Sequence, residues 1–235
     1  MNSAIQYRIF PLGDAAITVD FGNVIDETIN RKVQALFYQL LDDPLTGMIE
    51  AVPAYSSVTI YYDVYTIGKI LPGGKTVYEF MVEQMNERLK QPFSETDTVS
   101  RLVNIPVCYE KEFAPDIEEL AKEKNISVDE VIRIHTSKQY QVYMLGFLPG
   151  FAYMGKVDER IIIPRKPQPV TVAAGSVGIA GKQTGIYPLA SPGGWQIIGR
   201  TPLMLFDAMK GEPTFLKTGD TVQFIPITKN EFENY

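Results

Sequence analysis

The sequence predicts an α+β protein with two domains, a small N-terminal α/β domain at residues 1–92 and a C-terminal β-barrel or sandwich at residues 93–235. Three observations support this prediction. Strand-like runs alternate with helical periodicity in the first third, and residues 91–99 are polar, contain proline and lack periodicity. After Tyr140, short apolar runs are interrupted by glycine and proline every eight to twelve residues, which is typical of all-β folds.

In the N-terminal domain, four runs rich in β-branched and aromatic residues are typical of strands. These runs are residues 5–10, 15–21, 48–52 and 57–62. Apolar residues at helical spacing predict one helix over residues 29–40, which Asp42-Asp43-Pro44 ends, and a second helix over residues 75–90. We expect one sheet with both helices packed on one side.

The C-terminal domain begins with a predicted strand at residues 101–109 and a short helix near Pro115, a favoured first helical position. Ser127 and Glu130 form a capping-box pattern, which predicts a second helix. Six further runs indicate strands of a barrel or sandwich. These runs are residues 160–163, 170–173, 176–180, 195–199, 203–206 and 221–226.

Composition excludes several classes of protein. A formal charge of −6 argues against nucleic acid as the main partner, because phosphate binding needs a dominant basic face. No apolar run approaches the ~20 residues that span a bilayer, and the first residues lack the pattern of a secretory signal. Cys108 is the single cysteine, so an internal disulfide is impossible. We therefore expect a cytoplasmic protein without membrane attachment.

A glycine-rich segment at residues 146–201 differs from the rest of the chain. It has no Asp or Glu from residue 161 onward, but it carries Arg165, Lys166, Lys182 and Arg200. Glycine lets backbone N–H groups approach a ligand, and arginine supplies a planar fork of donors, so the segment indicates a pocket for a small anionic or carbonyl ligand. A turn-rich barrel that needs glycine and proline only for its backbone is the alternative.

Familiar catalytic motifs are incomplete. Five residues instead of four separate Gly68 from Gly74, so residues 68–76 do not form the phosphate-binding GxxxxGK[ST] loop. Residues 175–178 lack the residue that the GxSxG motif requires between glycine and serine. His135 is the single histidine, which leaves no histidine pair for a metal. It is the one acid–base candidate with an ordinary pKa near neutrality, but its apolar helix face is also typical of a core histidine.

Three runs resemble the allophanate hydrolase subunit 1 family. They are GFLPGFAYMG at residues 146–155, AGSVGIAGKQTGIYP at residues 174–188 and SPGGWQIIGRTP at residues 191–202. The resemblance covers nearly the whole chain and implies a sandwich-like N-terminal α/β domain and a cyclophilin-like barrel. The family includes the B subunits of bacterial ATP-dependent 5-oxoprolinases and the Kip-type inhibitors of sporulation kinases.

The resemblance implies a hydrolase subunit, inactive alone, that acts in the hydrolysis of 5-oxoproline to glutamate. Its implied partners in the complex are a protein of the allophanate hydrolase subunit 2 type and a protein of the lactam-utilisation type. ATP and magnesium would bind at the level of the complex, and this chain would hold no cofactor tightly. Two alternatives remain open: an inhibitor that binds a sensor histidine kinase, and the amide-binding part of a carboxyltransferase or allophanate hydrolase-like complex.

The resemblance also implies site residues, none of them metal ligands. It gives catalytic roles to His135, which precedes the GFLPGF turn as in the family, and to Arg200. It gives substrate-binding roles to Arg165, Lys182, Gln183, Tyr187 and Trp195. In this hypothesis, Arg165 and Arg200 bind a carboxylate or acyl phosphate, and Trp195 stacks on the flat face of the ligand.

Two positions depart from the family pattern. Val170 stands where a second arginine is expected, and Ala173 stands where a proline is expected. One cation of the implied pocket is therefore missing, which leaves a changed ligand open.

Overall fold

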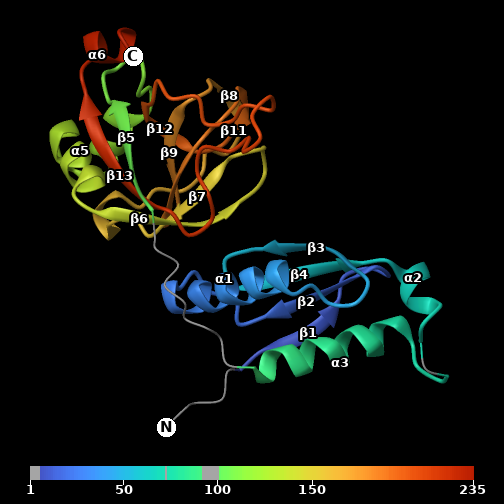
Figure 1. Cartoon of the computed structure of the whole chain (residues 1–235). Coiled ribbons are helices and arrows are strands. Elements are labelled where there is room, and N and C mark those ends of the chain that lie inside the picture. The colour runs from blue at the N-terminus through green and yellow to red at the C-terminus, as the bar shows by residue number, and fades with distance from the viewer. Residues whose placement is uncertain (1–5, 72, 92–100) are drawn as a thin grey trace. The chain divides into compact units, whose positions relative to one another are not determined.

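The computed structural model describes residues 6–71, 73–91 and 101–235 (Figure 1). The chain divides into two compact units, Met1–Thr98 and Val99–Tyr235. The predicted boundary between residues 92 and 93 lies outside the described residues and stays a prediction.

The first unit is a four-stranded antiparallel sheet with three helices. In spatial order, the strands are β1 (Arg8–Pro11), β2 (Ala16–Asp20), β4 (Ser57–Tyr62) and β3 (Met48–Pro53). The helices are α1 (Glu27–Asp42), α2 (Val64–Gly68) and α3 (Val77–Lys90). The four predicted strands and two predicted helices are thereby confirmed, and the short α2 is an addition.

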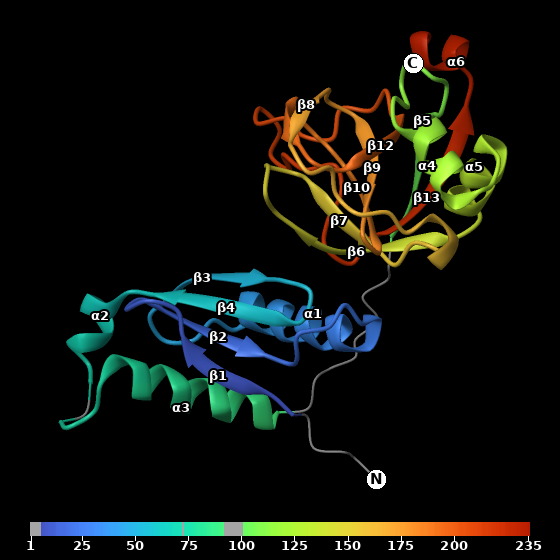
Figure 2. The ribbon, with the colours of Figure 1, turned by 180° about the vertical axis from the view of Figure 1, so that it is seen from behind.

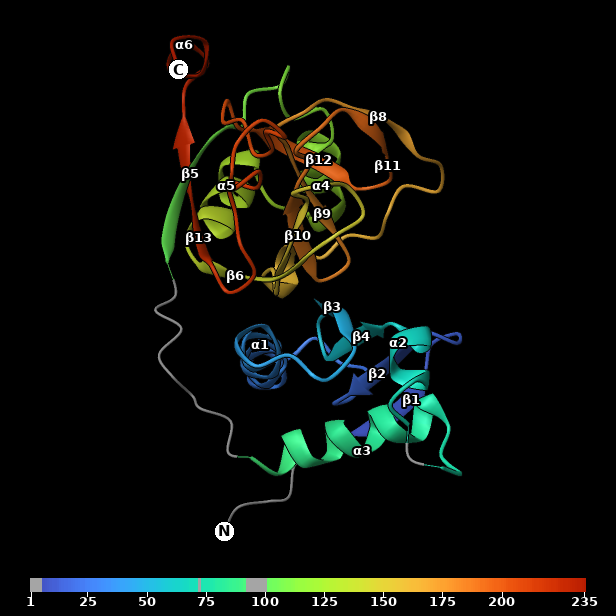
Figure 3. The same ribbon diagram turned by 45° about the vertical axis from the view of Figure 1, so that its right-hand side comes forward.

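Strand register gives this sheet one apolar face. Ile17 lies opposite Ile60 and Val19 lies opposite Val58, so all four side chains share a face. They belong to one buried cluster with residues of both α1 and α3, so both long helices cover that face (Figure 3). Thr76 caps α3 in a reciprocal capping box, so residues 73–76 lead into that helix.

The second unit is built on a closed seven-stranded barrel (Figure 2). Around the barrel, the strands are β10 (Gln183–Ile186), β7 (Ala152–Gly155), β6 (Gln139–Leu145), β13 (Thr221–Ile227), β5 (Leu102–Cys108), β12 (Gln196–Arg200) and β9 (Ser176–Ala180). A separate pair comprises β11 (Ser191–Gly193) and β8 (Val170–Val172). The helices are α4 (Ile117–Lys124), α5 (Val128–Thr136), the short 3₁₀ helix η1 (Glu159–Ile161) and α6 (Lys229–Glu233).

Two of the predicted barrel strands are wrong. Only the first two of residues 160–163 lie in η1, where the carboxylate of Asp158 accepts a hydrogen bond from the backbone N–H of Arg160 and starts a helical turn. Ile163 makes an isolated bridge, to Gly181. Residues 203–206 form no strand, and only Phe206 makes an isolated bridge, to Thr214. Four strands, β6, β7, β10 and β11, were not predicted.

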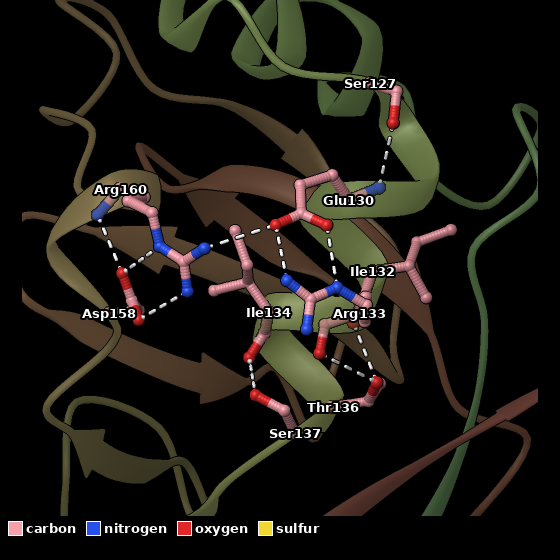
Figure 4. Close-up of polar contacts among 9 residues, drawn as sticks. All are labelled: Ser127, Glu130, Ile132, Arg133, Ile134, Thr136, Ser137, Asp158 and Arg160. Carbon is pink, nitrogen blue, oxygen red and sulfur yellow. Dashed lines mark hydrogen bonds and ion pairs between the residues drawn. The ribbon is translucent and has the colours of Figure 1, made fainter.

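The predicted capping box of α5 forms only in part. The Ser127 hydroxyl accepts a hydrogen bond from the Glu130 N–H at 3.1 Å, but the Glu130 carboxylate binds Arg133 at 2.6 Å and Arg160 at 3.2 Å instead (Figure 4). Arg160 also binds Asp158 at 2.9 Å, so this exposed network links α5 to η1. Exposed pairs of this kind contribute little stability, and here they mainly fix the position of η1.

The views of Figures 1 and 2 place the β8–β11 pair on the opposite side of the barrel from α5. Within the part of the chain that the structure describes, no helix has both the length and the apolar character to cross a bilayer.

Candidate functional site

A second apolar cluster lies outside the main core of the barrel unit. Val177 and Ile186 are cross-strand neighbours whose side chains belong to the barrel core. Their neighbours Gly178 and Gly185, also opposite each other, therefore face the other side of the sheet. The side chains of Trp195 and Phe151 lie next to these glycines, and three more aromatic rings contact these two or each other; we call the five residues the aromatic shelf. They are Phe147, Phe151, Tyr153, Tyr187 and Trp195.

We call Gly178 and Gly185 the glycine floor, because they place no side chain between the sheet and the aromatic shelf. A Cβ at Gly185 would lie 3.0 Å from the Trp195 ring and 3.1 Å from the Phe151 ring. A Cβ at Gly178 would lie 3.1 Å from the Cβ of Trp195. The Phe151 and Trp195 centroids are 5.4 Å apart at 81°, an edge-to-face arrangement that aromatic quadrupoles favour. The glycines therefore let the rings approach the backbone of the sheet closely.

The two tyrosines of the shelf keep their protons. Burial raises the pKa of Tyr187, although a hydrogen bond with the Trp195 backbone and the charge of Arg165 oppose the shift. Burial likewise raises the pKa of Tyr153, again against the influence of Arg165. Both hydroxyls are thus neutral, and the positive charge beside them belongs to the arginine.

The turn that carries Phe147 has an unusual backbone. Phe147 has φ 71°, a left-handed value that is rare for a residue with a large side chain. A hydrogen bond from the Leu148 N–H to the Gly146 carbonyl, at 2.9 Å, closes a γ-turn around it. Pro149 and Gly150, with φ 80° at the glycine, occupy the central positions of the next turn, as in type II turns. Phe147 is 62% exposed, and its ring meets the rings of Phe151 and Tyr187 in edge-to-face contacts.

Three predicted ligand-binding residues come together at the shelf. The guanidinium carbon of Arg165 lies 5.9 Å from the centroid of the Trp195 ring, within the range of a cation–π contact. Tyr187 is part of the same ring cluster, and the charge of Arg165 lowers its pKa against the larger effect of burial. Trp195 is only 4% exposed, so the indole contacts the arginine but has little surface of its own for a ligand.

Lys182 and Gln183 lie at the edge of this region. Gln183 is paired with Ala180 on β9, and Ala180 belongs to the apolar cluster under the shelf. Gln183 therefore faces the same side of the sheet as the shelf. Lys182 occupies the turn between β9 and β10, where its carbonyl accepts a hydrogen bond from the Val157 N–H at 2.9 Å.

Arg200 lies at the other end of β12 from Trp195. The separation is five residues along the chain, or about 16 Å for extended backbone. The Nε of Arg200 donates to the Ala174 carbonyl at 2.8 Å, and its guanidinium lies 5.9 Å from the Phe232 ring centroid. The two arginines therefore do not converge, and we correct the hypothesis that Arg165 and Arg200 bind one ligand group.

His135 lies inside the barrel with 0% exposure. Its Nδ1 is 2.9 Å from the Tyr109 hydroxyl, and its Nε2 is 3.0 Å from the Thr184 hydroxyl. The Thr184 hydroxyl donates its one proton to the Gly178 carbonyl, so Nε2 must donate to Thr184 and Nδ1 must accept from Tyr109. Burial lowers the pKa of His135 to about 3. The expected acid–base role therefore needs correction, because this neutral ring is enclosed in the core.

The remaining reactive side chain is also enclosed. Cys108 is buried, and burial raises the pKa of its thiol, so it is not a ready nucleophile. Across residues 6–71, 73–91 and 101–235, no group of three His, Cys, Asp or Glu side chains is placed to hold a metal ion. The shelf and Arg165 can thus bind and orient a ligand, but they offer no group that breaks bonds.

Sequence reasoning missed Asp116. Its carboxylate accepts a hydrogen bond from the Ile197 N–H at 2.6 Å and pairs with the ammonium group of Lys166 at 2.6 Å. Nothing in its local pattern marked it, because its partners are 50 and 81 residues away. The available signal for the shelf was the position of Phe151 and Trp195 in the sequence, each just after a Pro-Gly pair.

Comparison with known proteins gives a consistent result. The model of the family described as carboxyltransferase domain, subdomain C and D, matches residues 7–216. The chain is 45% identical over 233 residues to the 5-oxoprolinase B subunit of Bacillus subtilis (strain 168), covering 98% of this chain and 97% of that protein. It is 36% identical to the 5-oxoprolinase B subunit of Escherichia coli O157:H7, covering 93% and 95%. The crystal structure of TTHA0988 matches with a TM-score of 0.76 at 33% identity, covering 90% of this chain and 40% of that one.

Proposed function

The chain belongs to the family of carboxyltransferase domains, subdomains C and D, and from this premise we propose that it is the B subunit of a 5-oxoprolinase. One observation supports the proposal most strongly. The similarity to the 5-oxoprolinase B subunit of Bacillus subtilis runs through 98% of this chain and 97% of the relative, so the likeness is not limited to one shared domain.

In the proposed reaction, the complex hydrolyses 5-oxoproline to glutamate with ATP. A lactam amide is stable in water, so transfer of the terminal phosphoryl group of ATP to the lactam oxygen activates the carbonyl carbon. Water then adds to this carbon, and the ring nitrogen leaves as an amine that takes a proton from the water. This step gives γ-glutamyl phosphate, and a second water releases phosphate to give glutamate. We assign ATP and magnesium to the complex rather than to this chain.

We assign this chain to substrate recognition within the complex. His135 and Cys108 are enclosed, and residues 161–205, which include Arg165, Tyr187 and Trp195, contain no Asp or Glu. The groups that open the ring would therefore come from two partner proteins, one of the lactam-utilisation type and one of the allophanate hydrolase subunit 2 type. The chain alone would be inactive. Because the complex depends on ATP, we place it in the cytoplasm.

Reconstitution tests this proposal. The chain is co-expressed with these two partner proteins from the same organism, purified through a tag on this chain, and assayed for glutamate release from 5-oxoproline. We expect ATP-dependent glutamate release from the three proteins together and none when this chain is left out. Full activity of the two partner proteins without this chain, or failure of the chain to bind either of them, would refute the proposal.

A further inference from the structure

Arg165 has a fixed backbone. The Pro164 carbonyl accepts a hydrogen bond from the side-chain amide of Gln196 at 3.2 Å, and the Lys166 N–H donates to the Gly194 carbonyl at 2.7 Å. The Lys166 ammonium group binds Asp116 at 2.6 Å. Contacts on both sides therefore hold the chain at Arg165 and direct its side chain over the aromatic shelf.

The guanidinium of Arg165, in contrast, has no hydrogen-bond acceptor among the residues that the structure describes. Most other arginines of the described chain bind a carboxylate, as Arg101 binds Asp220 and Arg160 binds Asp158. Arg165 is exposed, its guanidinium lies over the Trp195 ring, and its charge acts on the hydroxyls of Tyr153 and Tyr187. All five of its N–H donors are thus available for a ligand.

The surroundings of Arg165 favour an added carboxylate. Residues 161–205 contain no Asp or Glu, and Asp116 is already occupied by Lys166. Buried aromatic rings on one side of the guanidinium reduce its exposure to water, which strengthens a charge-assisted hydrogen bond. Because guanidinium and carboxylate match in geometry, a planar two-point contact is the preferred use of this fork.

We propose that Arg165 binds the carboxylate of 5-oxoproline, with the lactam ring beside the exposed Phe147 and the reactive amide directed toward a partner protein. This inference rests on the proposed function and adds the group of the substrate that this chain recognises. Because the backbone at Arg165 is already fixed, ligand binding loses little backbone entropy, as expected of a preorganised receptor. The absence of reactive groups at the shelf agrees with a division in which this chain holds one end of the substrate.

The first test compares two substrates in the reconstituted complex. ADP release is measured with 5-oxoproline and with 5-oxoprolinamide, which carries a neutral amide in place of the carboxylate. We expect Arg165→Gln to raise the KM for 5-oxoproline by about 10- to 100-fold and to leave the KM for ATP unchanged. The preference of the unsubstituted complex for the acid over the amide should then largely disappear. Arg31→Gln, at an exposed arginine of α1, is the matched control and should change neither quantity.

Two results would overturn the proposal. If Arg165→Gln keeps both the KM and the preference for the acid, the carboxylate is bound elsewhere. If Arg165→Gln prevents assembly while Arg31→Gln does not, the arginine binds a partner protein instead of the substrate.

A second test does not depend on the proposed function. Trp195 is the single tryptophan of the chain and lies under Arg165, so its fluorescence reports on this site. If the unsubstituted complex does not turn over 5-oxoproline, the proposed function fails, and this titration of the chain alone decides the present proposal. Support would be an emission change with 5-oxoproline or proline, none with 2-pyrrolidinone, which lacks a carboxylate, and loss of the change in Arg165→Gln. Equal responses to all three compounds, or none to any, would overturn it.

Discussion

His135 shows how one side chain can link a core to the site above it. Its Nε2 binds the Thr184 hydroxyl, and that hydroxyl in turn binds the carbonyl of Gly178, one of the two floor glycines. The network therefore supports the sheet directly beneath the aromatic shelf. A protonated ring would lose its hydrogen bond from Tyr109, because a protonated Nδ1 is a donor and no longer accepts a hydrogen bond.

The buried histidine should make stability depend on pH. Its pKa is about 3 in the folded protein against an ordinary value of 6.5, so the unfolded chain binds a proton between these values and the folded chain does not. The contribution of the neutral His135 to stability is therefore present above pH 6.5 and falls by about 1.4 kcal/mol per pH unit as the pH drops from 6.5 towards 3. His135→Gln removes this dependence. We expect the stability difference between the unsubstituted protein and the variant to shrink by about 2 kcal/mol from pH 7 to pH 5.

Urea unfolding followed by Trp195 fluorescence at the two pH values measures this difference. Turnover of the reconstituted complex at pH 8 gives a second readout, and the variant should keep it if it remains folded. A stability difference that does not change with pH would contradict the burial of a neutral ring, and a folded but inactive variant would restore the catalytic role expected from the sequence.

The glycine floor is a property of paired strands rather than of single residues. Gly178 and Gly185 come from β9 and β10, and only the cross-strand register brings them together. A methyl group at Gly185 would lie 3.0 Å from both the Ala152 carbonyl oxygen and the Trp195 ring, with backbone on one side and a buried ring on the other. The carbonyl cannot yield easily, so the ring must move.

Gly185→Ala should therefore lift Trp195 from the sheet. We expect a loss of about 1–3 kcal/mol in the free energy of unfolding, as for other overpacked cores, and a red shift of tryptophan emission as the indole meets water. Gly211→Ala is the control, because a Cβ there would have no atom within 4 Å. Equal stability and emission in the two variants would show that the floor tolerates a side chain.

Strand prediction succeeded at several runs whose side chains are typical of strands, although it missed β6, which has such side chains too. The run Ser57–Tyr62 is rich in β-branched and aromatic residues, and it is β4 as expected. In contrast, β7, β10 and β11 are three or four residues long and contain glycine, so their local sequence also fits turns. β7 and β10 form because closing the barrel pairs them with neighbours, and β11 forms because it pairs with β8. A single sequence does not show these pairings.

The same limit applies to the site. Phe151 and Trp195 lie beside Pro-Gly pairs and could be predicted as a wall of a pocket, and the structure places them together. The sequence could not tell that Arg200 lies at the far end of a strand that begins just after Trp195, or that Asp116 supports the loop of Arg165. Strand direction and long-range pairing decide both facts, and neither leaves a mark in local composition.

Taken as a whole, the described chain has separate cores. The buried cluster of the first unit draws its members from residues 17–85, and the two clusters of the barrel unit draw theirs from residues 103–224. No buried residue belongs to clusters of both units, within the residues that the structure describes. Each unit thus holds a complete set of the apolar contacts that drive folding.

The two units should consequently fold independently. We expect a fragment of residues 101–235 to unfold cooperatively in urea, with a midpoint that agrees with the full chain within the ~10–15% uncertainty of such measurements. Trp195 reports only on this fragment, so its fluorescence follows the same unit in both proteins. The fragment of residues 6–91, followed by circular dichroism, should likewise unfold in one transition. A barrel fragment without a cooperative transition would show that its core needs the first unit, since its buried apolar clusters would then be insufficient by themselves.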